Sequence, residues 1–134
     1  MANSQRFDGL FAGMSESNAI ALLNQSSGEL DNPGLKYIAA TRLGACTSQE
    51  SLEALISASS GESEDIFGRI TRRKAIEALG RRKDPSTLAV IQKALLSDDE
   101  QTVVNAVDSL ITIGLPLTLV IKTILLCLLQ HSSA

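Results

Sequence analysis

The sequence predicts an all-α fold, an α-solenoid of stacked helix pairs. Three observations support this prediction. Of the 134 residues, 44% are hydrophobic but only 3% are aromatic, so Leu, Ile, Val and Ala must supply the core, and such a composition favours helices over a β-sandwich. Apolar residues recur at helical spacing, as in Ala75, Ile76 and Leu79. Three similar segments also repeat along the chain, and a repeat at this spacing is typical of solenoids.

The repeated segments read IAATRLG, KAIEALG and NAVDSLI. They align on Ala39, Ala75 and Ala106, which are 36 and 31 residues apart. In such arrays each unit buries its apolar face against its neighbours. We therefore expect about three to four repeats, with the last one incomplete, within one domain. The expected divisions are an N-terminal cap over 1–33, repeats over 34–60, 66–97 and 98–129, and a tail over 130–134.

The expected elements follow in chain order. An opening segment lies around Phe7 to Phe11, and a first helix covers about residues 17–25 before the loop SSGELDNPG. The paired helices are then expected over about 35–44 with 48–58, 69–81 with 86–96, and 101–113 with 117–129.

Residues at the helix starts agree with these divisions. Thr47 with Glu50 matches a capping box, in which side chains satisfy the first backbone N–H groups of a helix. Asp84 before Pro85 predicts an N-cap followed by proline at the first helical position.

Glycines and an acidic insert mark the expected helix ends and one loop. Gly44 and Gly80 stand where helices tend to end. The insert SGESED, over residues 60–65, accounts for the five extra residues in the longer repeat spacing. We expect it to form a surface loop.

The stretch TRRKAIEALGRRKDPSTLAVIQKALLSDDEQTVVNAVDSLITIG, Thr71 to Gly114, resembles the HEAT-like repeat of the phycobilin lyases. The segments YIAATRLGA, TSQESLEAL and ITRRKAIEALGRRKDP are most similar to the F-type subunit of the heterodimeric E/F lyases, nearest the phycoerythrin (CpeZ-type) branch. The similarity covers about residues 7–118. Compared with the repeat pattern, the chain is short at its C-terminal end.

The resemblance implies a subunit that assists the covalent attachment of an open-chain tetrapyrrole, a bilin, to a cysteine of a phycobiliprotein. The bilin, phycoerythrobilin or phycocyanobilin, would be the substrate, and no permanently bound cofactor is implied. The resemblance also implies a cytoplasmic setting, in a cyanobacterium or a derived plastid, and a lyase activity that needs a partner chain. The alternative is a non-catalytic HEAT-repeat chaperone or adaptor that binds a phycobiliprotein or another protein.

The candidate binding residues lie opposite the buried stripe of equivalent helices, so a solenoid places them on one surface. They are Tyr37, Thr41, Arg73, Glu77, Arg81, Val104 and Asp108. Arg73 and Arg81 are expected to hold propionates of a bilin, and Glu77 or Asp108 to accept hydrogen bonds from pyrrole N–H groups. Tyr37 would lie against a ring. The same surface also suits a protein partner.

Arg72 is expected to have a structural role instead. It stands beside the apolar stripe, where its stem can pack while the guanidinium reaches the turn of a neighbouring unit at Asp84. Val103 occupies the corresponding arginine position of the next unit. A ladder of Arg–Asp pairs is therefore expected to break there.

The residues needed for independent catalysis or a metal site are sparse. His131 is the single histidine and lies close to the C-terminal residue, so no catalytic residue and no metal ligand is assigned. The acidic residues 98–100 precede an expected helix, where its dipole favours anions. Cys46 and Cys127 have apolar neighbours and no CxxC spacing, which favours two free, packed thiols.

Charge argues against nucleic-acid binding. The net charge is −3 and the isoelectric point is near 5.1. Seven of the twelve Lys and Arg residues fall within 69–83, but at 100° per residue they do not form one patch. Aromatic residues do not alternate with them, as they do in single-strand binders.

The apolar run LPLTLVIKTILLCLL, Leu115 to Leu129, is 15 residues long, which is short of the ~20 needed to cross a bilayer. We expect no transmembrane segment but a buried first helix of a fourth unit. A covering helix is missing, so an apolar face should remain exposed. That face predicts association with an E-type lyase subunit or with a second copy of the chain.

Overall fold

The described residues of the computed structural model are 14–25, 32–60 and 65–132, without the side chains of 130–132. They confirm the all-α prediction, because within these ranges every regular element is a helix. The elements are α2 (Glu16–Asn24), α3 (Gly34–Leu43), α4 (Gln49–Ser60), α5 (Ile66–Arg82), the 3-10 turn η2 (Pro85–Thr87), α6 (Leu88–Ala94), α7 (Glu100–Ile113) and α8 (Leu117–Ser132). The expected segment Phe7 to Phe11 and residues 61–64 of the acidic insert lie outside the described ranges.

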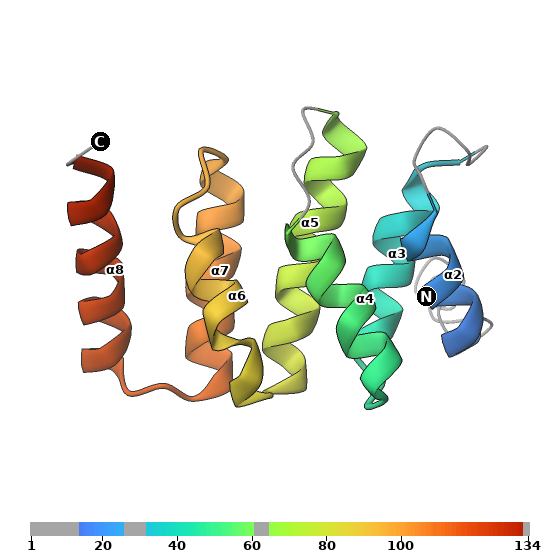
Figure 1. Cartoon of the computed structure of the whole chain (residues 1–134), viewed down its shortest axis with the longest axis horizontal. Coiled ribbons are helices and arrows are strands. Elements are labelled where there is room, and N and C mark those ends of the chain that lie inside the picture. The colour runs from blue at the N-terminus through green and yellow to red at the C-terminus, as the bar shows by residue number, and fades with distance from the viewer. Residues whose placement is uncertain (1–13, 26–31, 61–64, 133–134) are drawn as a thin grey trace, which may run out of the picture.

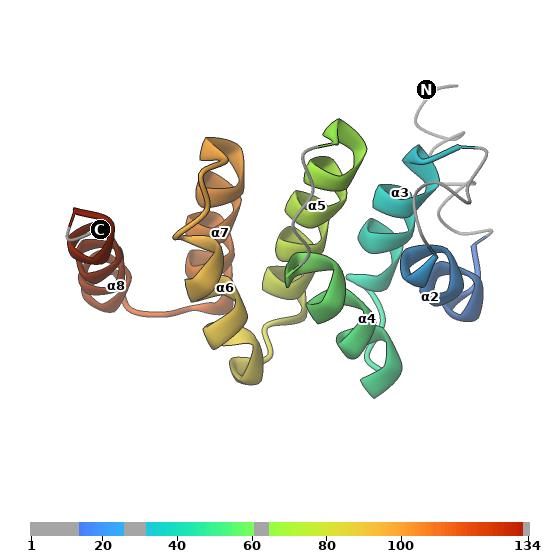
Figure 2. The same cartoon turned by 45° about the horizontal axis from the view of Figure 1, so that its top comes forward.

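The helices form two layers of a solenoid. In one layer α3 packs against α5 and α5 against α7, while in the other α2 contacts α4 and α4 contacts α6. Figures 1 and 2 show the resulting row of helices, which runs from α2 at one end to α8 at the other. The described residues thus have the stacked architecture that the repeat predicted.

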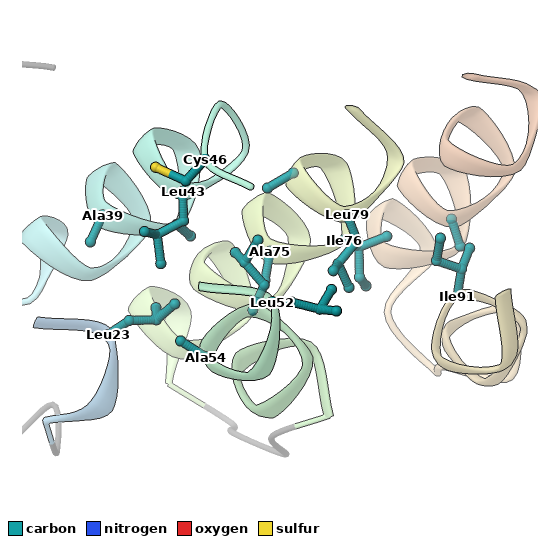
Figure 3. Packing of buried hydrophobic residues seen from close by; sticks show 14 of the residues in the cluster. Leu23, Ala39, Leu43, Cys46, Leu52, Ala54, Ala75, Ile76, Leu79 and Ile91 are labelled. Carbon is teal, nitrogen blue, oxygen red and sulfur yellow. The ribbon is translucent and has the colours of Figure 1, made fainter. Parts of the chain in front are cut away.

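The core between the layers combines alanines with aliphatic side chains. Ala39 and Ala75 have no exposed surface, so neighbouring helices can approach closely at these positions. Leu43, Ile76 and Leu79 are also fully buried and fill the space beside them (Figure 3). Burying each Leu or Ile side chain contributes roughly 1.5–3 kcal/mol. The two alanines are those on which the first two repeated segments align.

The helix starts agree with the sequence at η2 and differ at α4. Asp84 accepts a hydrogen bond from the backbone N–H of Ser86 at 2.9 Å, as an N-cap residue should. Before α4 the expected capping box of Thr47 and Glu50 is wrong. Ser48 caps the first turn instead, accepting from the N–H of Ser51 at 3.1 Å, and its own hydroxyl donates to Glu16 of α2.

The helix ends differ from expectation at Gly80. Gly44 follows α3 as predicted, but α5 continues past Gly80 and ends before Lys83, which adopts a left-handed conformation with φ of 55°. Gly80 is buried against Ser109 of α7, where a Cβ would lie 2.9 Å from the Ser109 Cα. The glycine is required by the close approach of α5 and α7 and not by a helix end.

The apolar C-terminal helix α8 was predicted to be buried, but most of its described side chains are exposed. Within its described side chains only Val120 is buried, at 2% exposure, while Leu117 is 67% exposed. α8 contacts α7 and lies at the end of the row in Figure 1. Most of its surface is therefore not packed against another helix of the described chain. The predicted exposed apolar face is therefore confirmed. No helix in the described part of the chain is both long and apolar enough to cross a membrane.

Candidate functional site

The candidate site is the solvent side of the α3, α5 and α7 layer, which we call the α3–α5–α7 face. We define it by the seven predicted residues: Tyr37 and Thr41 on α3, Arg73, Glu77 and Arg81 on α5, and Val104 and Asp108 on α7. Within each helix these residues are four apart, which places them on one side of that helix. Because the three helices are consecutive neighbours in one layer, their solvent sides adjoin.

Arg81 and Thr41 are brought together. An N–H of the exposed Arg81 donates to the backbone carbonyl of Thr41 at 3.0 Å, and the Thr41 hydroxyl donates to the carbonyl of Tyr37 at 2.9 Å. This chain of contacts joins α5 to α3 across the face. A guanidinium has five N–H donors, and the bond to Thr41 uses one of its nitrogens.

Arg73 has a structural partner that the sequence analysis did not predict. Its Nε and Nη2 donate to the two carboxylate oxygens of Asp99 at 2.8 and 2.7 Å, a bidentate pair. The Thr102 hydroxyl donates to the same carboxylate at 2.5 Å. Hydrogen bonds from Arg73 and Thr102 hold the pKa of Asp99 well below its usual range, against the opposing effect of burial, and Asp99 in turn raises the pKa of Arg73. The pair joins α5 to the start of α7.

Arg72 approaches a carboxylate other than that of its predicted partner, Asp84. Its Nη2 lies 3.9 Å from the carboxylate of Asp99, and its side chain is 15% exposed. Asp84 instead binds the Ser86 N–H, which lowers the pKa of Asp84. The carboxylate that Arg72 approaches stands at the start of the next unit, one helix further along the stack than expected.

Glu77 lies between Arg73 and Arg81 on α5, one turn from each. Its carboxylate pairs with Lys74 at 3.1 Å. The two side chains are 37% and 43% exposed, so water screens the pair and its contribution to stability is about 0.5 kcal/mol at most. Glu77 therefore remains accessible to a ligand.

The α7 part of the face is more apolar than predicted. Val104 is 49% exposed and Asp108 is also exposed, as expected of residues opposite the buried side of α7. Ile111, which the sequence analysis did not select, is 53% exposed and lies two turns from Val104. The sequence signal that could have identified Ile111 is its spacing of seven residues from Val104, which places both on one side of a helix.

Arg82 lies just beyond the helix expected over 69–81, but it is the last residue of α5 and contacts the preceding unit. Its guanidinium donates to the carbonyl of Cys46 at 2.6 Å, the hydroxyl of Ser51 at 2.7 Å and the carbonyl of Ser48 at 3.1 Å. These bonds fix α5 to the connection between α3 and α4. Much of the basic cluster is thus engaged in joining units.

The remaining chemical candidates lie apart from the face. Cys46 is a buried free thiol beside Arg42, and Cys127 is a partly buried free thiol on α8. Asp99 stands at the N-terminal end of α7, in agreement with the helix-dipole interpretation of residues 98–100. Within the described ranges, no three His, Cys, Asp or Glu residues gather as metal ligands would. The side chain of His131 lies outside those ranges.

The face offers several groups that can bind a ligand. It presents a cation at Arg81, carboxylates at Glu77 and Asp108, and the phenol of Tyr37, together with exposed aliphatic side chains on α7. Such a set can hold an extended molecule that has both acidic groups and apolar rings.

Comparisons with known proteins agree with this architecture. The sequence profile of the family described as HEAT repeats matches residues 19–111. The chain is also similar to the uncharacterized phycocyanin operon protein Y of Pseudanabaena tenuis, with 35% identity over 104 residues. The matched part is 78% of this chain but 25% of that protein, so the chain spans a quarter of the length of this relative.

Proposed function

We propose that this chain, which belongs to the HEAT repeats family, is a binding scaffold for phycobiliprotein maturation. In this role it holds a bilin and presents it to an acceptor cysteine. The observation that carries the proposal is the α3–α5–α7 face, which combines the exposed Arg81 and Asp108, the partly exposed Tyr37 and Glu77, and exposed aliphatic groups on α7. The similarity to a protein named for a phycocyanin operon supports a role connected with pigmented light-harvesting proteins. Its finer assignment, as an F-type subunit of an E/F lyase, rests on the sequence resemblance.

In this proposal the bilin lies across the three helices. Arg81 binds a propionate, Glu77 or Asp108 accepts pyrrole N–H bonds, and rings contact Tyr37 on α3 and the aliphatic groups on α7. The acceptor thiol belongs to the phycobiliprotein. Its sulfur bonds to the ethylidene group of the pigment and its proton is transferred to the pigment, so no other reactant is consumed. The scaffold contributes proximity and orientation.

The contacts of Arg73 change its proposed role. Both of its donating nitrogens bind Asp99, so binding of a propionate there would break the link between α5 and α7. We therefore assign the propionate to Arg81 and assign Arg73 to positioning α7, whose Val104 and Asp108 complete the face.

A second candidate function, a non-catalytic adaptor or chaperone for a phycobiliprotein, is favoured by one observation. Val104 and Ile111, which lie before and after Asp108 along α7, each expose about half of their surface. Exposed aliphatic residues next to a charged one can supply the apolar centre and part of the polar rim of a protein interface. In this case the partner would cover the α7 part of the face.

Co-expression with a bilin source, a phycobiliprotein acceptor subunit and an E-type lyase subunit distinguishes the two functions. The scaffold function predicts covalent pigment on the acceptor, measured by bilin fluorescence on a denaturing gel. Arg81→Gln should lower the yield by about tenfold, since a charged hydrogen bond is worth roughly 1.5–3 kcal/mol. Lys93→Gln, an exposed change on α6 in the other layer, is the control and should have no effect.

More folded acceptor without any added pigment would favour the adaptor function instead. Equal adduct yields with the wild-type chain, with Arg81→Gln and without the chain would contradict a role in attachment.

A further inference from the structure

In the described part of the chain, exposed large hydrophobic residues are most numerous on α8. Twelve large hydrophobic residues of the described ranges are exposed, and seven of them belong to this helix. They are Leu117, Leu119, Ile121, Leu125, Leu126, Leu128 and Leu129, each between 46% and 67% exposed. Monomeric proteins rarely leave such residues contiguous unless the patch binds something.

The side chains of α8 divide into three directions, at 100° per residue. Val120, Ile124 and Cys127 belong to the core or pack against it, and they define the side toward α7. Four aliphatic residues form a stripe along one flank of that side: Leu117, Ile121, Leu125 and Leu128. Leu119 and Leu126 lie on the other flank. We call the set of four the α8 stripe.

The charge pattern restricts what can cover the α8 stripe. Between residues 117 and 129 the single charged residue is Lys122, and no acid is present. A complementary surface must therefore be apolar and nearly uncharged. At the other end of the described row, the exposed residues of α2 are Ser17, Asn18, Ala21 and Asn24, so α2 itself offers few apolar side chains to α8 of a copy stacked head to tail.

The spacing of the α8 stripe makes it self-complementary. Its members are separated by four, four and three residues, which is nearly the same pattern when it is read in reverse. In an antiparallel pair of α8 helices with a two-fold axis near residue 123, Ile121 faces Leu125 of the second copy and Leu117 faces Leu128 of the second copy. Lys122 lies outside the α8 stripe, on the side of the helix that points away from α7, so this pairing leaves it at the edge of the interface.

We propose that the α8 stripe is a dimer interface, in which α8 pairs antiparallel with α8 of a second copy of this chain. A two-fold interface uses the same patch twice, so one apolar surface of suitable chemistry is sufficient. The proposal is independent of the function proposed for the α3–α5–α7 face, because it concerns another surface and needs no bilin.

Sedimentation equilibrium of the full chain tests the proposal with two matched variants. Ile121 and Leu119 are similarly exposed, at 50% and 46%, but only Ile121 belongs to the α8 stripe. The wild type should be a dimer, and Ile121→Glu should raise its dissociation constant by about 30-fold or more, as expected at an interface hot spot. Leu119→Glu should change it by less than about threefold. Circular dichroism should show the same helix content in all three, because both side chains are exposed.

Three outcomes would overturn the proposal. The first is a wild type that remains monomeric up to about 100 μM, a concentration at which even a weak specific dimer forms. The second is an equal weakening of association by the two variants. The third is binding of α8 to an E-type lyase subunit while the chain itself stays monomeric. If Ile121→Glu loses helicity, Leu125→Gln repeats the test without introducing a charge.

Discussion

Asp99→Ala is expected to lower the free energy of unfolding by about 3 kcal/mol, within the range for removing a partner from a hydrogen-bonded charge pair. The change removes the carboxylate that binds Arg73 through two bonds, accepts from Thr102 and lies near Arg72. It leaves two arginines without this carboxylate between α5 and α7. Urea unfolding, followed by circular dichroism, measures the loss.

The pH dependence of the same variant tests the cause. The pKa of Asp99 is lowered by folding, so its stabilising effect is fully present above the pKa of the unfolded chain, near 3.9, and is lost as pH falls toward the folded value. The difference in stability between wild type and Asp99→Ala should therefore be constant from about pH 7 to pH 5 and shrink below about pH 4.

Asp98→Ala is the matched control for Asp99, because Asp98 is the preceding acid and is exposed. It should change the free energy of unfolding by less than about 0.5 kcal/mol. Equal losses for the two variants would mean that general charge near the start of α7, and not the bond to Arg73, provides the stability.

Gly80→Ala should lower the free energy of unfolding by about 2 kcal/mol, although alanine is the better helix former by roughly 1 kcal/mol. A Cβ at this position would lie 2.6 Å from the Ser109 hydroxyl oxygen and 2.9 Å from the Ser109 Cα. Ser109 also donates to the carbonyl of Ile76 at 2.9 Å, so it cannot turn away without breaking a buried bond. The backbones of α5 and α7 would have to separate.

Gly44→Ala provides the comparison for Gly80. Its closest neighbours would be Arg81 guanidinium nitrogens, at 2.5 and 2.9 Å, and these lie at the far end of a flexible side chain. The third neighbour, the Ala78 Cβ at 3.1 Å, would have to shift only slightly. The expected loss is below about 1 kcal/mol, because Arg81 is exposed and gives up only its bond to Thr41 when it moves. A larger loss at Gly44 than at Gly80 would contradict the tight α5–α7 contact.

The fold could be predicted because its determinants are local or periodic. The alignment of Ala39, Ala75 and Ala106 gives the repeat, and apolar spacing gives the helices between Gly34 and Ile113. Asp84 caps η2 through a residue two positions away, so its role is also visible in the sequence. Interactions within one turn of helix do not depend on how the units stack.

The bonds between units could not be predicted, because they join residues far apart in sequence. Arg73 binds Asp99 26 positions away, and Arg82 binds the Cys46 carbonyl 36 positions away. From the sequence, any of several arginines between residues 69 and 83 could form such bonds, and only the stacking of the units determines which of them does. The exposure of α8 was likewise decided by packing, since its apolar sequence suits both a buried helix and an interface.

A fluorescence titration tests the proposed role of the α3–α5–α7 face most directly. It measures the dissociation constant of the complex that this chain forms with a phycobiliprotein acceptor subunit and a bilin. Val104→Glu places a charge on the face, and Ile66→Glu places one on a similarly exposed aliphatic residue at the start of α5. The account predicts that Val104→Glu raises the dissociation constant by about tenfold or more, while Ile66→Glu leaves it unchanged. Wild-type affinity in Val104→Glu would contradict the account.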